Sequence, residues 1–255
     1  MSDSVESGMD VSAPLNSLIS KMLKSTSTGM KTLLLDSSTT QSVSVTLSKT
    51  HANSAELYLI DLLGKPQQVV GGMKALIYVR PTMDNVDLIC REVSRGNFGE
   101  YHLFFSNVLP QSCLEAIAKA DSNQLIRQVH EFPFDYVPIN PDLFTINISG
   151  SIGMSRCWGT AREMSVQSVM KREVEGLLSV FLSLKKPVHS IVASSKEPAC
   201  SYLAKEVKRR VAGDDIYVFR STRPTQLLIV SFFFPFRSFA ASLRVLCCAV
   251  KLALQ

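Results

Sequence analysis

The sequence lacks the features that would assign it at once to a membrane, fibrous or disordered class. No stretch offers 18 clean apolar residues, so no membrane-spanning helix is predicted. With 12 glycines, 11 prolines and no strict repeat, collagen-like and low-complexity chains are excluded. The 255 residues are 46% hydrophobic and 19% charged, a composition typical of one large or two modest globular domains.

Sequence motifs of several enzyme classes are also missing. There is no G-x-x-x-x-G-K-[ST] or G-x-G-x-x-G pattern for a phosphate group and no G-x-S-x-G pattern for a nucleophilic serine. None of the six cysteines forms a C-x-x-C pair and the four histidines stand far apart, so no metal site is predicted. These absences favour a binding role, without a cofactor, over catalysis.

The cysteines and the first residues indicate the compartment. Most of the cysteines lie in apolar stretches, where buried free thiols are expected. Residues 1–10 are polar and acidic and have no apolar signal-peptide core. We therefore expect a cytoplasmic chain with reduced thiols.

Acidic residues are absent from one end of the chain. Residues 216–255 carry five cations and no acid, whereas the other 215 residues carry 22 basic and 22 acidic side chains. The net charge of +5 therefore belongs to the C-terminal end. A nucleic-acid binder would need a basic surface on its folded body, so no nucleic-acid partner is predicted.

Short apolar runs alternate with amphipathic stretches along the chain. Strands are expected at residues 32–36, 42–47, 57–60, 75–79 and 101–105, with further extended segments at 125–132, 136–139, 188–193, 217–219 and 227–230. Helices are expected at residues 15–23, after the N-cap Thr82, and from the capping-box spacing of Ser112 and Glu115, with Leu114, Ile117 and Ala118 inward. This alternation predicts an α/β fold with a mostly parallel sheet covered on both faces.

Composition divides the chain into four parts. Residues 1–15 are rich in Ser and Asp and are predicted to be disordered. A first domain is predicted at 16–146, followed by an incomplete second α/β domain at 147–230, which opens with a long amphipathic helix. Residues 231–255 form an atypical apolar tail in which Arg237, Arg244 and Lys251 are spaced by seven. On a helix these cations would form one narrow stripe, suited to a membrane interface, although a buried helix or a stretch without a native fold is equally compatible.

Asp36 and two histidines are the polar residues considered as candidates for ligand binding or catalysis. Asp36 ends the first predicted strand, at the sheet edge where open α/β proteins bind ligands, but it could equally cap the following turn. His102 and His130 fall in predicted strands beside apolar residues. Neither has a positioned nucleophile, so a packing role is favoured over base catalysis.

An ordered series of segments is more specific than any single residue. It comprises residues 29–36 (GMKTLLLD), 56–60 (ELYLI), 73–82 (MKALIYVRPT) with Asn85, 99–107 (GEYHLFFSN), 120–121, 129–136 and 139–144 (INPDLF). The series resembles the Sec/Munc (SM) family of syntaxin-binding proteins over about residues 18–230, and especially the branch that serves Golgi-to-endosome traffic. The resemblance implies a Rossmann-like first domain and a non-enzymatic protein that binds a syntaxin-type SNARE and supports vesicle docking and fusion.

The resemblance also implies two contact surfaces. An outer pocket would take the N-terminal peptide of the syntaxin, with an apolar groove for a peptide side chain and a carboxylate for a basic one. Its residues would be Leu109, Leu114, Ala118, Ile126, Val129 and Glu131. An inner SNARE cleft would lie beside Asp36. For Leu114 and Val129, simple core packing is an equally open interpretation.

The chain departs from the family pattern after Val230. We expect a truncated or aberrantly spliced form, with residues 231–255 read from non-native sequence. Attachment to Golgi and endosomal membranes is then expected mainly through the SNARE. The alternatives are a Rossmann-like enzyme that uses the cleft near Asp36 and a peripheral membrane protein held by the C-terminal tail.

Overall fold

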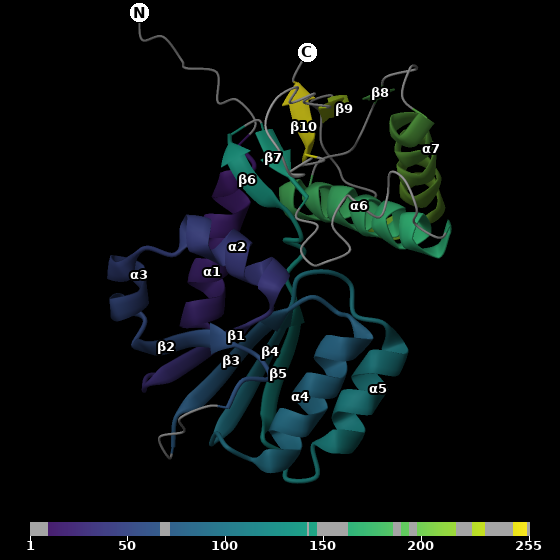
Figure 1. The fold of residues 1–255 in the computed structure, drawn as a ribbon. Helices are drawn as coiled ribbons and strands as arrows, with labels where there is room; N and C mark the ends of the chain where they lie inside the picture. Colours follow the sequence, from purple (N-terminus) through teal and green to yellow (C-terminus); the bar gives the residue numbers. More distant parts are fainter. Residues whose placement is uncertain are drawn as a thin grey trace, which may run out of the picture. The chain divides into compact units, whose positions relative to one another are not determined.

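The computed structural model shows two compact units (Figure 1). One comprises residues 15–135, and the other residues 1–14 with 136–255. The structure describes residues 10–66, 72–141, 143–146, 163–185, 190–193, 198–217, 226–232 and 247–253. Each unit is taken by itself below.

A five-stranded sheet organises residues 15–135. Its strand order is β2-β1-β3-β4-β5, and every neighbouring pair is parallel. The strands are β1 (Lys31–Leu35), β2 (Leu57–Leu62), β3 (Lys74–Val79), β4 (Glu100–Phe105) and β5 (Ile126–Glu131). The predicted α/β fold with a parallel first sheet is confirmed.

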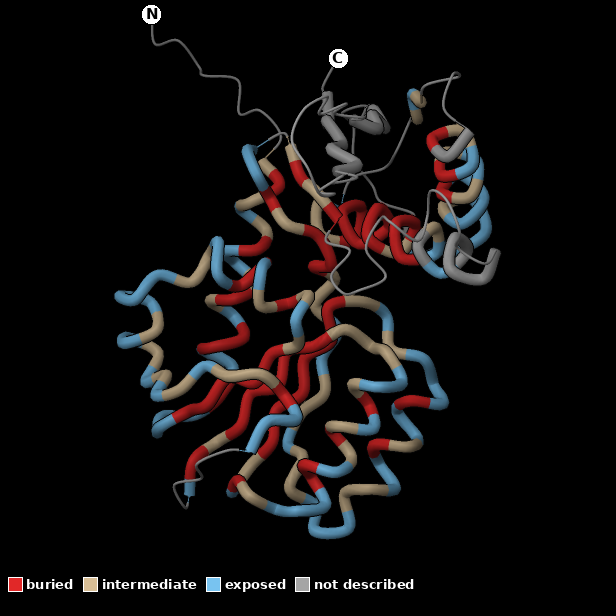
Figure 2. Tube along the Cα trace, in the orientation of Figure 1, coloured by how far each residue is buried: buried red, intermediate tan, exposed pale blue. Residues whose placement is uncertain are grey.

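Helices cover both faces of this sheet. On one face α4 (Met83–Arg95) and α5 (Gln111–Ala120) share a buried core with alternate residues of β3 and β4, among them Ile77 and Leu103. On the other face α1 (Ser12–Lys24) packs near Tyr78 of β3. Figure 2 shows the result as continuous burial along the central strands. Parallel strands buried on both faces read as uninterrupted apolar runs, which is why they were recognisable in the sequence.

The N-terminal helix begins earlier than predicted. Helix α1 starts at Ser12, so the expected disorder of residues 1–15 is wrong for residues 12–15. The Asp10 carboxylate accepts hydrogen bonds from the backbone N–H and the hydroxyl of Ser12. These bonds satisfy donors at the helix start, a contribution that the Ser/Asp-rich composition conceals.

The strand predicted at residues 42–47 is wrong. The chain there belongs to α2 (Ser37–Thr46), which precedes α3 (Lys49–Ser54) and β2. Asp36 and Thr39 form a capping box at its start, and Thr39, Ser42 and Val43 are its buried residues. The apparent alternation of Val43 and Val45 misled because Val45 is exposed and the buried positions follow a helical period.

The caps of α4 and α5 differ. Thr82 caps α4 as predicted, its hydroxyl accepting the N–H of Asn85 at 3.3 Å. The predicted capping box of α5 is wrong, since the helix begins after Pro110 without a side-chain cap bond. Ile117 faces inward as expected, but Leu114 and Ala118 are exposed, so the predicted burial of these two residues is wrong.

The second unit holds a mixed sheet with strand order β6-β7-β10-β9-β8. Only the β8–β9 pair is parallel among its described strands. Its elements are β6 (Val137–Asn140), β7 (Leu143–Thr145), α6 (Glu163–Leu184), β8 (Ser190–Ala193), α7 (Pro198–Gly213), the 3-10 helix η1 (Asp215–Tyr217), β9 (Gln226–Phe232) and β10 (Cys247–Ala253). Tyr217 is thus not in a strand, and residues 218–219 lie outside the described residues. The predicted first domain, residues 16–146, includes strands β6 and β7, which pair in this second sheet. The predicted limit between residues 146 and 147 stays a prediction.

The described part of the C-terminal tail is extended, not helical. Strand β10 pairs antiparallel with β9 from Cys247 opposite Phe232 to Ala253 opposite Gln226. Lys251 therefore lies in a strand, where side chains alternate between two faces. Lys251 is therefore not part of a helical stripe, which was one of three possibilities that the sequence left open. Arg237 and Arg244 lie outside the described residues.

Candidate functional site

The six residues predicted for the peptide pocket occupy three successive segments. Leu109 lies in the loop before α5, Leu114 and Ala118 lie on α5, and Ile126, Val129 and Glu131 lie on the outer strand β5. We call these six residues the α5–β5 surface. Because β5 is the last strand of the sheet, its far edge is not paired within this sheet.

Leu114 and Ala118 give this surface its exposed apolar part. They are four residues apart and so lie on one side of α5. Leu114 has 37% of its area exposed, whereas its neighbour Ile117 has 2% exposed and belongs to the core. An exposed leucine flanked by buried residues can accept a partner's side chain without unfolding the helix.

The remaining apolar members form a supported base. Leu109, Ile126 and Val129 are half-buried and pack against the core cluster that contains Cys113 and Ile117. Their side chains are therefore held by the core while part of each stays accessible. A surface whose apolar side chains are both fixed and accessible can receive the anchor side chain of a bound peptide.

Glu131 is exposed at the end of β5, and its carboxylate has a partner within the chain. The Leu109 N–H donates to Glu131 Oε1 at 2.7 Å. The structure thus brings two of the predicted residues together directly. Glu131 also aligns with Phe105 in the β4–β5 pairing.

Asp121 is a further residue at this site, and it is not among those predicted. It follows α5, and its two carboxylate oxygens accept the N–H groups of Leu125 at 2.8 Å and Ile126 at 3.0 Å. Aspartate often bonds to backbone groups a few residues on in a turn. An aspartate between the end of a predicted helix and the start of a strand was the signal available in the sequence.

Asp36 is the centre of a polar network within its own unit. Its Oδ1 accepts the N–H groups of Ser38 and Thr39 and the Thr39 hydroxyl, at 2.7–3.0 Å. Its Oδ2 accepts the Arg80 N–H at 2.8 Å and the Asn85 side-chain amide at 2.7 Å. The alternative that Asp36 caps the next turn is therefore confirmed. Its place in a SNARE cleft stays a prediction.

A second carboxylate supports the same strand ends. Asp135 is buried with 3% exposed, and its Oδ2 lies 3.0 Å from Arg80 Nε. The Arg80 backbone is bonded to Asp36 as described above. Arg80 therefore links the ends of β1 and β3 to the segment after β5.

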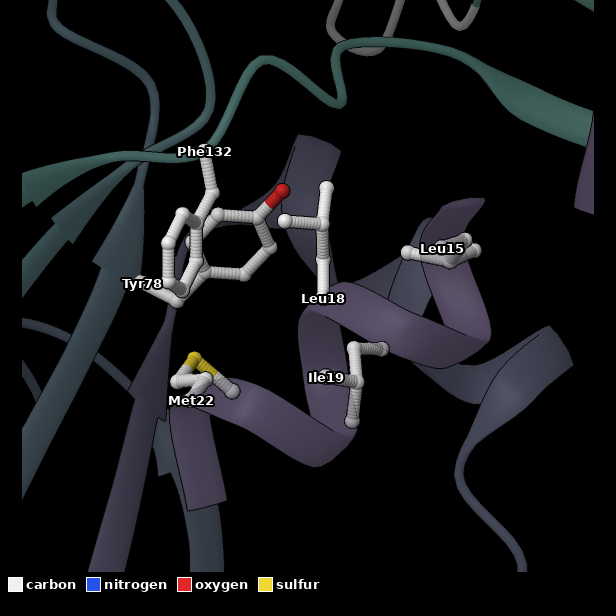
Figure 3. Close-up of a pocket in the computed structure, with 6 residues that line it drawn as sticks. All are labelled: Leu15, Leu18, Ile19, Met22, Tyr78 and Phe132. Atoms are coloured by element: carbon white, nitrogen blue, oxygen red, sulfur yellow. The ribbon is translucent and has the colours of Figure 1, made fainter. Parts of the chain in front are cut away.

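A small hollow lies between α1 and the sheet, away from the predicted pocket residues. It is lined by Leu15, Leu18, Ile19, Met22, Tyr78 and Phe132 and has no room for a water molecule. Figure 3 shows the rings of Tyr78 and Phe132 side by side, with Leu18 beside them and Met22 below. The Tyr78 hydroxyl donates to the Phe134 carbonyl at 3.2 Å. The lining is apolar packing between a helix and a sheet, with no group placed for chemistry.

Glu100 is the centre of a polar cluster at the N-terminal ends of the strands, the ends opposite to Asp36. Glu100 carboxylate oxygens lie 3.6 Å from Lys74 Nζ, 3.5 Å from His102 Nε2 and 3.7 Å from Arg127 Nε. His102 is 6% exposed, and neither ring nitrogen makes a hydrogen bond to the described residues. Burial lowers the pKa of His102 below its ordinary value, despite the opposing attraction of Glu100. This favours a neutral, packed imidazole, as the sequence predicts.

The part of the chain that the structure describes shows neither a metal site nor a membrane-spanning helix. No group of three or more His, Cys, Asp or Glu side chains is arranged to hold a metal ion in that part of the chain. None of the described helices combines the length and apolar character needed to cross a bilayer. Cys113 and Cys200 are buried and Cys90 is half-buried.

Comparison with known families decides the affiliation of the chain. The sequence model of the Sec1 family matches residues 31–231, most of both units. The chain belongs to the Sec1 family. The family resemblance drawn from the ordered sequence segments is thereby confirmed.

Relatives within the Sec1 family include vacuolar protein sorting-associated protein 45. The Dictyostelium discoideum protein is 34% identical over 224 residues, and the Homo sapiens protein 33% identical over 225; each alignment covers 87% of this chain and 38% of the relative. The structure of the SM protein Vps45 in complex with the Qa SNARE Tlg2 (1-310) has a TM-score of 0.78 and 34% identity, covering 87% of this chain and 40% of that one. The chain thus spans about two fifths of the length of these relatives.

Proposed function

We propose that this Sec1-family chain binds a syntaxin-type SNARE and regulates vesicle docking and fusion without catalysing a reaction. The contact proposed is the α5–β5 surface, which takes an apolar side chain near the N-terminus of the SNARE. The Vps45 relative of known structure is in complex with a Qa SNARE, which supports the class of partner. The α5–β5 surface includes the outer strand β5 of the first sheet, which leaves it accessible to a partner.

The exposure of Leu114 is the observation that carries this proposal. Leu114 leaves apolar area accessible on α5 beside the buried stripe that holds the helix to the sheet. Leu109, Ile126 and Val129 pack, half-buried, against the core cluster that holds Cys113 and Ile117, the helix neighbours of Leu114. An incoming leucine or phenylalanine would bury apolar area of Leu114 and of these three residues. Binding through one anchored apolar side chain is typical of short-peptide recognition.

The proposed setting is traffic between the Golgi and endosomes or vacuole. The relatives named for vacuolar protein sorting support this assignment. The chain would act in the cytoplasm, peripheral to Golgi and endosomal membranes, and reach them through its SNARE partner.

The environment of Asp36 supports a non-enzymatic role. A general base needs free lone pairs directed at a substrate. The five hydrogen bonds that Asp36 accepts all come from its own unit. The carboxylate that the enzyme alternative would use is therefore occupied in holding the fold.

The test is a binding titration with the full chain. A fluorescent peptide with the N-terminal sequence of a cognate syntaxin is titrated with the chain, and its anisotropy is measured. We expect saturable binding that Leu114→Arg weakens at least about tenfold, because a buried unpaired guanidinium would replace an apolar contact. Thermal unfolding should change little, since Leu114 is exposed.

Val45→Arg is the matched control. Val45 is an exposed apolar residue on α2, outside the α5–β5 surface. Binding should survive this change. Equal loss of binding in both variants, or no loss in Leu114→Arg, would contradict the proposed contact.

A further inference from the structure

Carboxylates tie both ends of α5 to the neighbouring strand β5. At the start of the helix, the Leu109 N–H donates to Glu131, which ends β5. After the helix, Asp121 accepts the N–H groups of Leu125 and Ile126, where β5 begins. One carboxylate therefore lies on the strand and bonds the helix's entry loop, and the other lies at the helix end and bonds the strand.

We propose that Glu131 and Asp121 are positioning residues that set the placement of α5 against β5 and thereby the spacing of the α5–β5 surface. Glu131 acts through the backbone of Leu109 rather than as the charged partner of a basic peptide residue. This inference rests on the proposed function, because it concerns the same peptide-binding surface.

In the loop before α5, the Leu109 side chain packs against the core cluster and the Val108 N–H donates to Asn107 Oδ1 at 2.9 Å. Helix α5 begins after Pro110 without a side-chain cap bond, so the bond to Glu131 adds a restraint on the loop backbone that no helix cap supplies. Val108 and Pro110, the neighbours of Leu109, are exposed. The bond from Leu109 to Glu131 is therefore a specific restraint on where Leu109 presents its side chain.

The bonded atoms allow this role to be separated from a charge contact. Leu109 donates to Oε1 of Glu131, and a glutamine in the same place retains a carbonyl oxygen that can accept the same N–H. A direct ionic contact with a basic peptide residue would be lost in glutamine and alanine alike. A positioning role is lost in alanine and kept in glutamine.

For Asp121 we expect the opposite of the Glu131→Gln result: its amide variant, Asp121→Asn, should lose the positioning role. Its two oxygens accept two separate N–H groups, and asparagine has only one carbonyl oxygen. The amide group of Asp121→Asn would face one backbone donor with its own donor. We therefore expect glutamine to rescue position 131 and asparagine to fail at position 121.

The experiment compares Glu131→Gln, Glu131→Ala and Asp121→Asn in the full chain by the same peptide titration. Glu131→Gln should bind within about twofold of the unmodified chain, and Glu131→Ala should bind about five- to tenfold more weakly, as expected for one lost hydrogen bond. Amide-resolved hydrogen exchange supplies the second readout. The Leu109 amide should exchange faster in Glu131→Ala and remain protected in Glu131→Gln.

Glu115 provides the control for a general charge effect. It is an exposed acid on α5 whose carboxylate accepts the Gln111 side chain of the same helix at 3.3 Å. Glu115→Ala removes one negative charge and should leave binding and Leu109 protection unchanged.

The outcomes separate this inference from the proposed function. If the unmodified chain does not bind the peptide, the proposed function fails; Leu109 protection then still decides whether Glu131 positions the loop. If the unmodified chain binds and Glu131→Gln loses as much affinity as Glu131→Ala, the carboxylate is a charge contact and the positioning inference is overturned. Faster Leu109 exchange in Glu131→Gln would also overturn it.

Discussion

Two carboxylates that follow parallel strands, Asp36 after β1 and Glu131 at the end of β5, have different surroundings. Asp36 is half-buried and accepts five hydrogen bonds from its own unit, whereas Glu131 is exposed and accepts one backbone N–H from the loop before α5. A carboxylate at a strand end is therefore not by itself a binding group. Its neighbours decide whether it stabilises the sheet or shapes a surface.

Two apolar residues of α5 show the same contrast. Ile117 is 2% exposed in the core, while Leu114 is 37% exposed three residues earlier. Both fit one amphipathic pattern in the sequence. Only the structure separates the residue that holds the helix from the one that remains available to a partner.

The largest change in the free energy of unfolding is expected when Ile117, the core residue of α5, is replaced. Ile117→Arg would place an unpaired charge among buried apolar side chains and should lower the free energy of unfolding by about 4 kcal/mol or more. Leu114→Arg should change it by less than about 0.5 kcal/mol. Chemical denaturation of both variants measures the difference. Similar stability of the two variants would show that the difference in burial between Ile117 and Leu114 does not decide how much each stabilises the chain.

The next effect concerns Asp36. Asp36→Ala removes the cap of α2 and leaves the Arg80 N–H without its acceptor, which should destabilise the chain by about 2–5 kcal/mol. Peptide affinity per folded molecule should stay within about twofold, because none of the five hydrogen bonds of Asp36 involves a residue of the α5–β5 surface. Thermal unfolding and the peptide titration on the same sample measure both. Unchanged stability with lost peptide binding would reverse the roles assigned to Asp36 and Glu131.

A smaller effect is expected from His102. Burial lowers its pKa in the folded chain below the unfolded value of about 6.5, so the unfolded chain binds the proton more readily. The stability that depends on neutral His102 is complete above about pH 6.5 and is lost as the pH falls toward the folded-state pKa. His102→Gln should therefore reduce the loss of stability between about pH 7.5 and about pH 5.5, by roughly 1 kcal/mol or less.

His130→Gln is the control for this pH effect, because His130 lies exposed on β5. Denaturation curves at the two pH values measure both variants. If His130→Gln reduced the acid sensitivity as much as His102→Gln, burial of His102 would not be its cause.

The sequence predicted the central strands well and the polar segments less well. Strands β3 and β4 are buried on both faces, so their apolar runs needed no knowledge of neighbours. The strand prediction for residues 42–47 was wrong because serine and threonine alternate with valine there. The capping box that starts helix α2 lies several residues earlier. In β10, pairing with a distant strand decided the conformation of an apolar segment that could also have been helical.

The residues of the α5–β5 surface could be proposed only from the family resemblance, and their role stays a prediction. Nothing in the periodicity of α5 distinguishes exposed Leu114 from buried Ile117, because both lie on its apolar side. Asp121 bonds the backbone N–H groups of Leu125 and Ile126, so no pattern of partner side chains marks it. Its place between the end of a predicted helix and the start of a strand was the signal in the sequence.

Hydrogen exchange measured by mass spectrometry, with and without a syntaxin N-terminal peptide, tests the central claim most directly. The account predicts slower exchange in the full chain at residues 107–131, around α5 and β5, with no change at residues 36–62, around Asp36, α2 and β2. Protection confined to residues 36–62, with residues 107–131 unaffected by saturating peptide, would contradict it.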